Sequence, residues 1–138
     1  MCPTGGAEII RGAPYFPVPD VSSIGAYYRD ILGFHCEYAA GDPQEFAVYS
    51  RNGSAVMFRR VQEPSVISPN ERQGGTWDVF FWVNDVEALY GELTLKGASV
   101  VYSPVIQPYQ MKEFAVRDPN GYVLGFGQEW PTGTAAAG

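Results

Sequence analysis

Few side chains in this sequence are able to do chemistry on their own. There is one histidine, His35, so a metal site that needs two imidazoles from one chain is excluded, as is the iron site of two histidines and one carboxylate. His35 lies at the expected start of a strand, where a single histidine is more often structural than catalytic. The sequence contains no Gly-x-Ser-x-Gly, phosphate-binding loop or Cys-x-x-Cys motif, which argues against nucleophilic, nucleotide and dithiol chemistry.

The most informative polar residue is Asp78. It stands between Trp77 and Val79 in an apolar segment, where an unpartnered buried carboxylate would cost several kcal/mol. Asp78 therefore needs a partner. Two kinds remain open: an ion pair with Arg59 or Arg117, or a cationic or hydrogen-bonding group on a ligand.

Two further carboxylates, Glu45 and Glu113, begin two copies of one segment. Residues 45–58 (EFAVYSRNGSAVMF) align without a gap with residues 113–126 (EFAVRDPNGYVLGF), with identity at seven of fourteen positions. Such self-similarity predicts a duplicated structural unit. Each glutamate is either part of a site or a solvated strand end, and the sequence leaves both interpretations open.

The elements around these residues follow the same order in each copy. A strand comes first, then a helix that begins near an Asx cap and ends at a glycine, then three strands with an Asn-Gly turn before the last. In the first copy the strand is 14–18, the helix runs from Asp20 to Gly33, and the later strands are 34–38, the EFAV segment and 54–60. In the second they are 77–83, a helix from Asn84 or Asp85 to Gly97, then 99–102, EFAV and 122–128.

Length and composition limit the classes of protein. With 138 residues, of which 46% are hydrophobic and 17% charged, the chain has enough apolar surface for one folded domain. We expect a first module at 10–60, a linker at 61–75, a second module at 76–130 and a disordered tail at 131–138. A net charge of −6 argues against nucleic-acid binding. The sequence has no long apolar run and only two cysteines, Cys2 and Cys36. These two features predict a cytoplasmic protein without membrane association.

The duplicated βαβββ pattern resembles the vicinal oxygen chelate superfamily. Its specific pieces are residues 28–34 (YRDILGF) and 113–122 (EFAVRDPNGY), and the likeness extends over residues 13–128. That superfamily includes glyoxalase I, extradiol dioxygenases, fosfomycin-modifying enzymes and bleomycin-resistance proteins. The resemblance implies an α+β fold in which two tandem modules form curved mixed sheets around a central cleft. It also implies a homodimer whose chains complete the clefts together.

The resemblance further implies where metal ligands would lie. The corresponding positions here are Ala13, Met57, Asp78 and Gly125. Only Asp78 offers a donor that a hard cation prefers. We therefore expect no metal and no other cofactor.

The same resemblance implies which side chains line the cleft. The ligand-binding residues expected from it are Tyr15, Tyr49, Met57, Asp78, Phe80, Trp82 and Glu113. Tyr109 and Met111 are added because the polar and aromatic loop at 107–112 lies just before a cleft strand and is expected to form a flexible rim. On the same strands, the residues expected to face the helices are Phe46, Val48, Trp77, Val79, Phe81, Val83, Phe114 and Val116.

The leading functional hypothesis is metal-free binding and sequestration of a small aromatic compound, neutral or cationic, in the manner of bleomycin-resistance proteins. No bond would be broken, and no residue is assigned a catalytic role. The alternative is a glyoxalase- or dioxygenase-type enzyme that uses a metal or acid–base site near Asp78, with Glu113 as a second carboxylate. A scaffold without a ligand is the third possibility.

Overall fold

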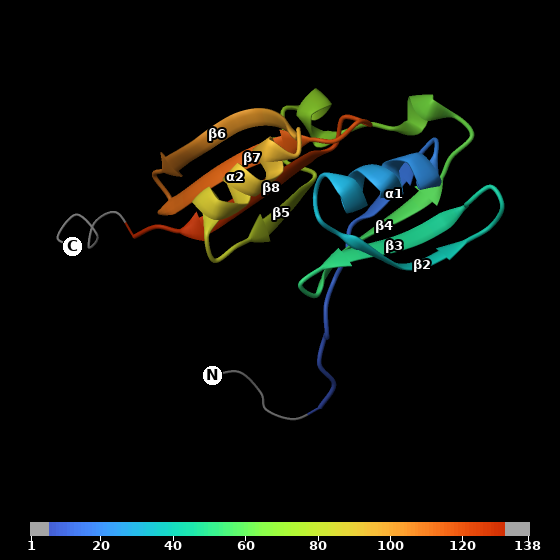
Figure 1. The fold of residues 1–138 in the computed structure, drawn as a ribbon, viewed down its shortest axis with the longest axis horizontal. Helices are drawn as coiled ribbons and strands as arrows, with labels where there is room; N and C mark the ends of the chain where they lie inside the picture. The colour runs from blue at the N-terminus through green and yellow to red at the C-terminus, as the bar shows by residue number, and fades with distance from the viewer. Residues whose placement is uncertain (1–5, 132–138) are drawn as a thin grey trace.

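The computed structural model describes residues 6–131 and has the predicted α+β fold. The first module contains β1 (Tyr15–Val18), α1 (Val21–Asp30), β2 (His35–Ala40), β3 (Phe46–Arg51) and β4 (Ser54–Arg60). The second contains β5 (Val79–Trp82), α2 (Val86–Leu95), β6 (Ser99–Gln107), β7 (Met111–Arg117) and β8 (Val123–Glu129). Two short 3₁₀ helices, η1 (Pro64–Val66) and η2 (Asn70–Gln73), lie in the connection that joins the modules along one side of the molecule (Figure 1). Cys2 and the predicted disordered tail, apart from Pro131, lie outside the described residues.

The helix ends have the predicted local causes. Asp20 caps α1 and Asp85 caps α2, each through a side-chain oxygen that accepts a hydrogen bond of 3.0 Å from a backbone N–H three residues on. Gly33 and Gly97 follow the helices with φ of 77° and 94°, which a residue with a Cβ adopts only at a cost. These signals fix where each helix begins and ends, and so which strand follows it.

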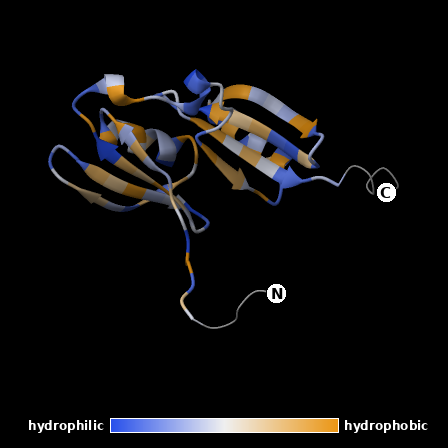
Figure 2. Cartoon of the chain, turned by 180° about the vertical axis from the view of Figure 1, so that it is seen from behind, coloured by the Kyte–Doolittle hydropathy of each residue, from blue (hydrophilic) through white to orange (hydrophobic). Residues whose placement is uncertain are grey.

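Each module forms one four-stranded sheet with its helix on one face. The strand orders are β1-β4-β3-β2 and β5-β8-β7-β6, and in both sheets the first strand runs parallel to the last while the other neighbours are antiparallel. Hydrophobic residues are concentrated along the strands (Figure 2). We call the face of each sheet that its helix does not cover the open face.

The two modules share a core that crosses their junction. Phe16 of β1 stacks on Tyr122 of the second module with ring centroids 4.2 Å apart, and the Tyr122 hydroxyl donates to the Pro17 carbonyl at 2.7 Å. The Tyr28 hydroxyl of α1 donates to Asp118 at 2.8 Å. The helix sides of both modules are thereby packed together, which leaves their open faces away from this shared core.

The repeated segments are not in the structural register that their gapless alignment implies. Two residues separate β3 from β4, whereas five separate β7 from β8. Phe46 pairs with Arg59 in the first hairpin, and Glu113 pairs with Gly127 in the second. With Phe58 and Phe126 taken as equivalent, Phe46 rather than Glu45 takes the place of Glu113. Because side chains alternate along a strand, this one-residue shift exchanges the two faces of β3.

The shift overturns three orientations expected from the sequence. Val48, predicted beneath the helix, lies on the open face with Phe46. Tyr49, predicted on the open face, lies beneath α1, with its hydroxyl where a Cβ on Gly25 would stand. Phe46, predicted beneath the helix, lies on the open face, and its ring is 6.1 Å from those of Tyr15 and Tyr38.

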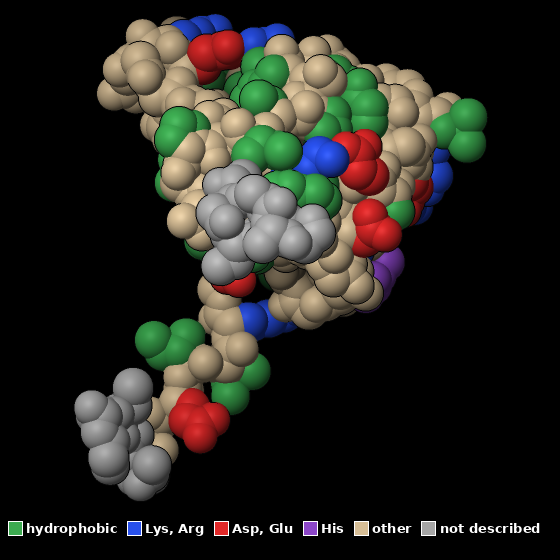
Figure 3. All heavy atoms as spheres, turned by 90° about the vertical axis from the view of Figure 1, so that its left-hand side faces the viewer, with side chains coloured by type: hydrophobic (Ala, Val, Ile, Leu, Met, Phe, Trp, Pro, Cys, Tyr) green, Lys and Arg blue, Asp and Glu red, His purple; other side chains and the backbone are tan. Residues whose placement is uncertain are grey.

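The segment before β1 projects from the body of the molecule (Figure 3). Ile9 and Ile10 are 94% and 86% exposed, and the segment is held near the sheet by an ion pair between Arg11 and Glu37 at 2.7 Å. Within residues 6–131, none of the helices is long and apolar enough to span a bilayer.

Candidate functional site

Three aromatic rings form a row on the open face of the second module. Phe80 of β5 lies between Trp77 and Trp82, with ring centroids 4.6 and 5.1 Å away. The neighbouring strand supplies Gly125 and Gly127, where an added Cβ would come within 2.6 Å of the Trp77 or Phe80 ring. The glycines therefore let the Trp77 and Phe80 rings approach β8 closely, and the tilted rings present both faces and edges to an aromatic molecule.

A buried carboxylate lies beside this row. Glu113 of β7 has 0% exposed surface, and its two oxygens accept hydrogen bonds from Tyr102 at 2.6 Å and Tyr109 at 2.7 Å. The Trp77 indole N–H in turn donates to the Tyr102 hydroxyl at 2.9 Å. The four side chains form one hydrogen-bonded network, which we call the Glu113 network.

Burial and the nearby carboxylate keep the two phenols protonated. Burial, followed by the hydrogen bond to Glu113, raises the pKa of Tyr109 to about 12. The same two causes raise the pKa of Tyr102 well above its ordinary value. Both hydroxyls therefore stay protonated and donate to the two oxygens of Glu113.

The network borders a recess of about 700 Å³ between β6 and the start of the second module. Its volume falls within the range of about 300 to 1,000 Å³ that is common for small-molecule sites. The lining residues are Thr76, Trp77, Tyr102, Ser103, Pro104, Val105, Gln107, Tyr109 and Glu113. We call this cavity the recess.

Of the predicted ligand-binding residues, Tyr109 and Glu113 line the recess, Phe80 and Met111 lie next to Glu113, and Trp82 lines a different cavity. Phe80, Met111 and Glu113 surround Gly127, and each would lie within 3.3 Å of a Cβ placed there. Tyr109 and Trp82 are more exposed, at 55% and 71%.

Of the nine residues that line the recess, seven are absent from the sequence-based set, and two of these, Trp77 and Tyr102, belong to the Glu113 network. Trp77 was expected to face α2, but β5 begins only at Val79, so the alternation of that strand does not extend back to Trp77. Tyr102 lies between two register irregularities in the β6–β7 pairing, where alternation no longer indicates a face. The only available signal for either residue was its aromatic character.

Three predicted residues lie elsewhere. Tyr15 and Met57 are register partners on the first sheet, and their shared open face also carries Arg59, whose guanidinium is 5.9 Å from the centre of the Tyr15 ring. Tyr49 is in the core beneath α1. A single chain therefore does not bring Tyr15 or Met57 to the recess.

Asp78 has a partner of a kind that the sequence did not indicate. Its two carboxylate oxygens accept hydrogen bonds from the backbone N–H groups of Asn70 and Val123, both at 2.8 Å. Of the two kinds of partner left open, the ion pair with Arg59 or Arg117 does not form, because Arg117 pairs with Glu71 and Arg59 lies over the Tyr15 ring. Asp78 joins the connection between the modules to the start of β8, and it is not among the residues that line the recess.

The metal-ligand positions of the superfamily do not fit a divalent cation here. Ala13, Met57 and Gly125 supply no oxygen or nitrogen side-chain donor, and both oxygens of Asp78 already accept backbone hydrogen bonds. Across residues 6–131 the structure contains no group of three or more His, Cys, Asp or Glu side chains placed to share an ion.

Comparison with known proteins gives one family and several solved structures. The sequence profile of the Glyoxalase/Bleomycin resistance protein/Dioxygenase superfamily matches residues 13–126. No curated protein sequence matches the chain at a significant level.

The solved structures share the fold. TioX from Micromonospora sp. ML1 has a TM-score of 0.69 and 24% identity, covering 86% of this chain and 98% of its own. The bleomycin-binding protein of Streptomyces verticillus, solved with copper(II)-bleomycin, has a TM-score of 0.66 and 24% identity over 88% and 97%. A bleomycin resistance determinant encoded on transposon Tn5 has a TM-score of 0.67 and 19% identity over 86% and 97%.

Proposed function

Because the chain belongs to the glyoxalase/bleomycin resistance protein/dioxygenase superfamily, we propose that it binds a small aromatic compound, neutral or positively charged, in the recess. The compound is held and released without a chemical change. The observation that carries this proposal is the Glu113 network, in which a fully buried carboxylate lies beside an accessible row of aromatic rings.

The aromatic row supplies the attraction for a planar ring. Trp77 lines the recess and Phe80 lies beside it, with ring centroids 4.6 Å apart, so a ligand that stacks on the Trp77 ring removes apolar surface from water. Aromatic side chains at such a site commonly contribute about 1 to 3 kcal/mol each to binding.

The Glu113 network supplies the preference for charge. A carboxylate that is removed from water attracts a cation more strongly than an exposed one does, and it repels an anion equally. Two tyrosine donors hold the carboxylate in one orientation, so its remaining lone pairs are fixed relative to the recess. Asp78, which the sequence suggested as a second determinant of charge, has both oxygens bound to backbone amides and takes no part in the proposal.

The structural neighbours support binding rather than chemistry. One of them is a bleomycin-binding protein and another a bleomycin resistance determinant, although at 24% and 19% identity their likeness concerns the fold. The alternative, an enzyme with a metal or acid–base site near Asp78, would need a free carboxylate. Both oxygens of Asp78 already accept hydrogen bonds from backbone N–H groups.

We also propose that the protein works as a homodimer, in which the open face of one chain's first module covers the recess of the other. Tyr15, Tyr38 and Phe46 give that face an aromatic surface of its own. Tyr15 and Tyr38 are 53% and 57% exposed, which suits a surface that faces a ligand or a second chain.

The proposal is tested by titration of tryptophan fluorescence with three planar compounds that differ in charge: 9-aminoacridine as the cation, acridine as the neutral ring and acridine-9-carboxylate as the anion. Bleomycin without copper is added as a fourth probe. We expect the cation to bind at least about tenfold more tightly than the anion, because Glu113 is buried beside the ring site.

Glu113→Gln is expected to remove most of this charge preference while stacking is kept. Glu45→Gln is the matched control, because Glu45 has the same place in the repeated sequence but is paired with Arg60 at an exposed position. A wild-type preference for the anion, or an unchanged preference in Glu113→Gln, would contradict the proposal.

A further inference from the structure

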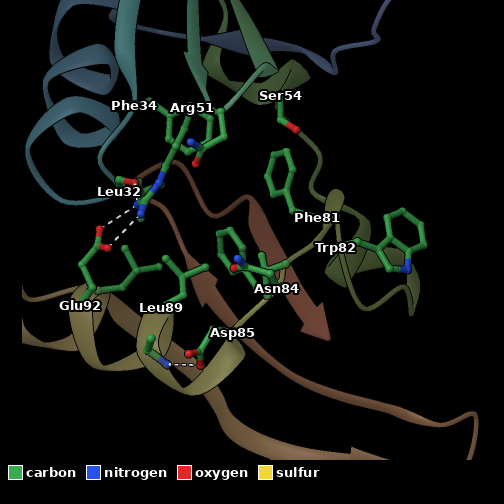
Figure 4. Close-up of a pocket in the computed structure, with 15 residues that line it drawn as sticks. Leu32, Phe34, Arg51, Ser54, Phe81, Trp82, Asn84, Asp85, Leu89 and Glu92 are labelled. Carbon is green, nitrogen blue, oxygen red and sulfur yellow. Dashed lines mark hydrogen bonds and ion pairs between the residues drawn. The ribbon is translucent and has the colours of Figure 1, made fainter. Parts of the chain in front are cut away.

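A second cavity, of about 460 Å³, lies where the two modules meet (Figure 4). It is separate from the recess, because the two sets of lining residues have no member in common. Its walls come from both modules: the end of α1 and the β3–β4 turn on one side, and β5, α2 and β8 on the other. We call it the junction cavity.

The inner part of the junction cavity is aromatic and aliphatic. Phe34 of the first module faces Phe81 of the second with ring centroids 6.1 Å apart, and Phe81 stacks on Phe126 at 5.5 Å. Leu89 of α2 completes this surface in Figure 4. Three rings in contact present both ring edges and ring faces to the space, which favours a planar aromatic occupant.

The charged groups around the cavity already have partners within the protein. The Arg51 guanidinium makes two hydrogen bonds to the Glu92 carboxylate, at 2.7 and 2.9 Å, and another to the Leu32 carbonyl. Asp85 accepts from the Ala88 N–H at the start of α2. Because Arg51 and Glu92 offset each other and Asp85 is stabilised as the N-cap at the positive end of the α2 dipole, a charged ligand would lose hydration for little compensating attraction.

The rim retains unused hydrogen-bonding capacity. The side chains of Asn52, Ser54 and Asn84 line the cavity and make no hydrogen bond to any of residues 6–131. Two amides and a hydroxyl at the mouth of an apolar space are suited to a ligand with one neutral polar group, such as a hydroxyl, ketone or amide.

We propose that the junction cavity is a second small-molecule site, selective for an uncharged planar aromatic compound that carries a neutral polar group. Its selectivity differs from that of the recess, where the unneutralised Glu113 favours a cation. A compound bound here touches both modules and therefore stabilises their junction.

The test uses three naphthalenes that differ only in their polar group: 2-naphthol, 2-naphthoate and 2-(aminomethyl)naphthalene, which are neutral, anionic and cationic at pH 7. Binding is followed by shifts of backbone amide signals in two-dimensional NMR. We expect 2-naphthol to shift the amides of Phe34, Phe81 and Leu89, and the two charged compounds to shift them at least about tenfold more weakly at equal concentration.

Matched variants separate the two sites. Ser54→Trp places a large ring at the mouth of the junction cavity from an exposed turn, and Ser103→Trp places the same ring at an exposed position of the recess. Ser54→Trp is expected to weaken 2-naphthol binding at the junction about tenfold or more, while Ser103→Trp leaves it unchanged.

The proposal is overturned if 2-naphthol shifts only amides around the recess, if either charged naphthalene shifts the junction amides as strongly, or if Ser54→Trp has no effect there. Failure of acridine binding in the recess would leave these signals unaltered. The two proposals therefore fail independently.

Discussion

Glu45 and Glu113 begin identical tetrapeptides, yet their surroundings give them different properties. Glu45 is exposed and forms an ion pair with Arg60 at 2.8 Å. Glu113 is fully buried and accepts a hydrogen bond from one tyrosine on each oxygen. A surface ion pair of the first kind contributes little to stability or binding, whereas a buried and oriented carboxylate produces a strong local field. The chemistry of the site thus depends on the burial of the residue rather than on its type.

Asp118 is a second buried carboxylate, at the junction between the modules. It is 3% exposed and accepts hydrogen bonds from the Tyr28 hydroxyl and from the backbone N–H groups of Asn120 and Tyr122. Burial raises the pKa of Asp118 to about 6, against an opposing effect of these three hydrogen bonds. Its folded pKa therefore lies above the unfolded value of 3.8.

This shift predicts how stability depends on pH. A group whose pKa is raised by folding stabilises the folded state fully below its unfolded pKa, and the contribution is lost as pH rises through its folded pKa. We expect the stability advantage of the wild type over Asp118→Asn to fall by about 2 to 3 kcal/mol between pH 4 and pH 7. Urea unfolding of both proteins at several pH values measures it.

Asp30→Asn is the control for Asp118. The hydrogen bond from Arg29 lowers the pKa of Asp30, so any change with pH has the opposite sign. An Asp118 carboxyl signal in ¹³C NMR that titrates below pH 4 would contradict the raised pKa.

At the scale of elements, the sequence predicted well what local chemistry decides. The order of strands and helices, the cap at Asp20 and the glycine after each helix all follow from residues close to one another in the chain. The faces of the strands were predicted less well. The orientation of Tyr49 depends on the strand register beyond the β3–β4 turn, and that of Tyr102 depends on irregular pairing between β6 and β7. The alternation of residues along one strand does not reveal either register.

The candidate site shows the same limit. Phe80 and Glu113 were found because they alternate regularly on β5 and β7, whereas Met111, expected in a flexible loop at the rim, is the buried first residue of β7. The partners of Asp78 could not be found, because backbone amides of distant segments carry no signature in the sequence.

The packing of α1 on β3 gives a prediction for two helical glycines. In Gly25→Ala the new methyl group would meet the Tyr49 side chain, with Cζ at 2.6 Å, so we expect a loss of about 1 to 3 kcal/mol in the free energy of unfolding. Gly91 of α2 has open space around it, and Gly91→Ala should gain about 0.5 to 1 kcal/mol. Urea unfolding measures both variants.

Replacing Tyr49 by a smaller apolar residue should recover part of the loss in Gly25→Ala. Equal stabilisation by Gly25→Ala and Gly91→Ala would mean that Tyr49 does not lie beneath α1.

At the scale of the whole molecule, the shared core separates the two aromatic surfaces. Tyr28 and Asp118 join α1 to the second module, and Arg51 and Glu92 join the β3–β4 turn to α2. Each helix thus contacts the other module, while each open face remains uncovered. A second chain is the simplest way to bring one open face over the other.

The proposed homodimer predicts that binding in the recess depends on protein concentration. Affinity for 9-aminoacridine should fall when the protein is diluted below the dissociation constant of the dimer, as followed by light scattering and fluorescence. Tyr15→Ala and Glu113→Gln should each weaken binding.

A mixture of these two variants provides the sharper test. Mixed dimers would contain one site that carries both changes and one site that carries neither, so part of the population should bind with wild-type affinity. If a monomer binds with full affinity, or if mixing restores nothing, each site belongs to a single chain.

The turn between β3 and β4 has a consequence for how the two modules diverged. The two copies have the same number of residues from EFAV to the closing phenylalanine, so the shift required no insertion or deletion. The turn takes two residues in the first module and five in the second, and the strand pairing slides by one residue, which moves every side chain of β3 to the opposite face. This shift places Phe46 in the first module where the second has Glu113. After a duplication, two copies of the same four letters, EFAV, could therefore acquire one aromatic surface and one carboxylate site without the substitution of any of those four residues.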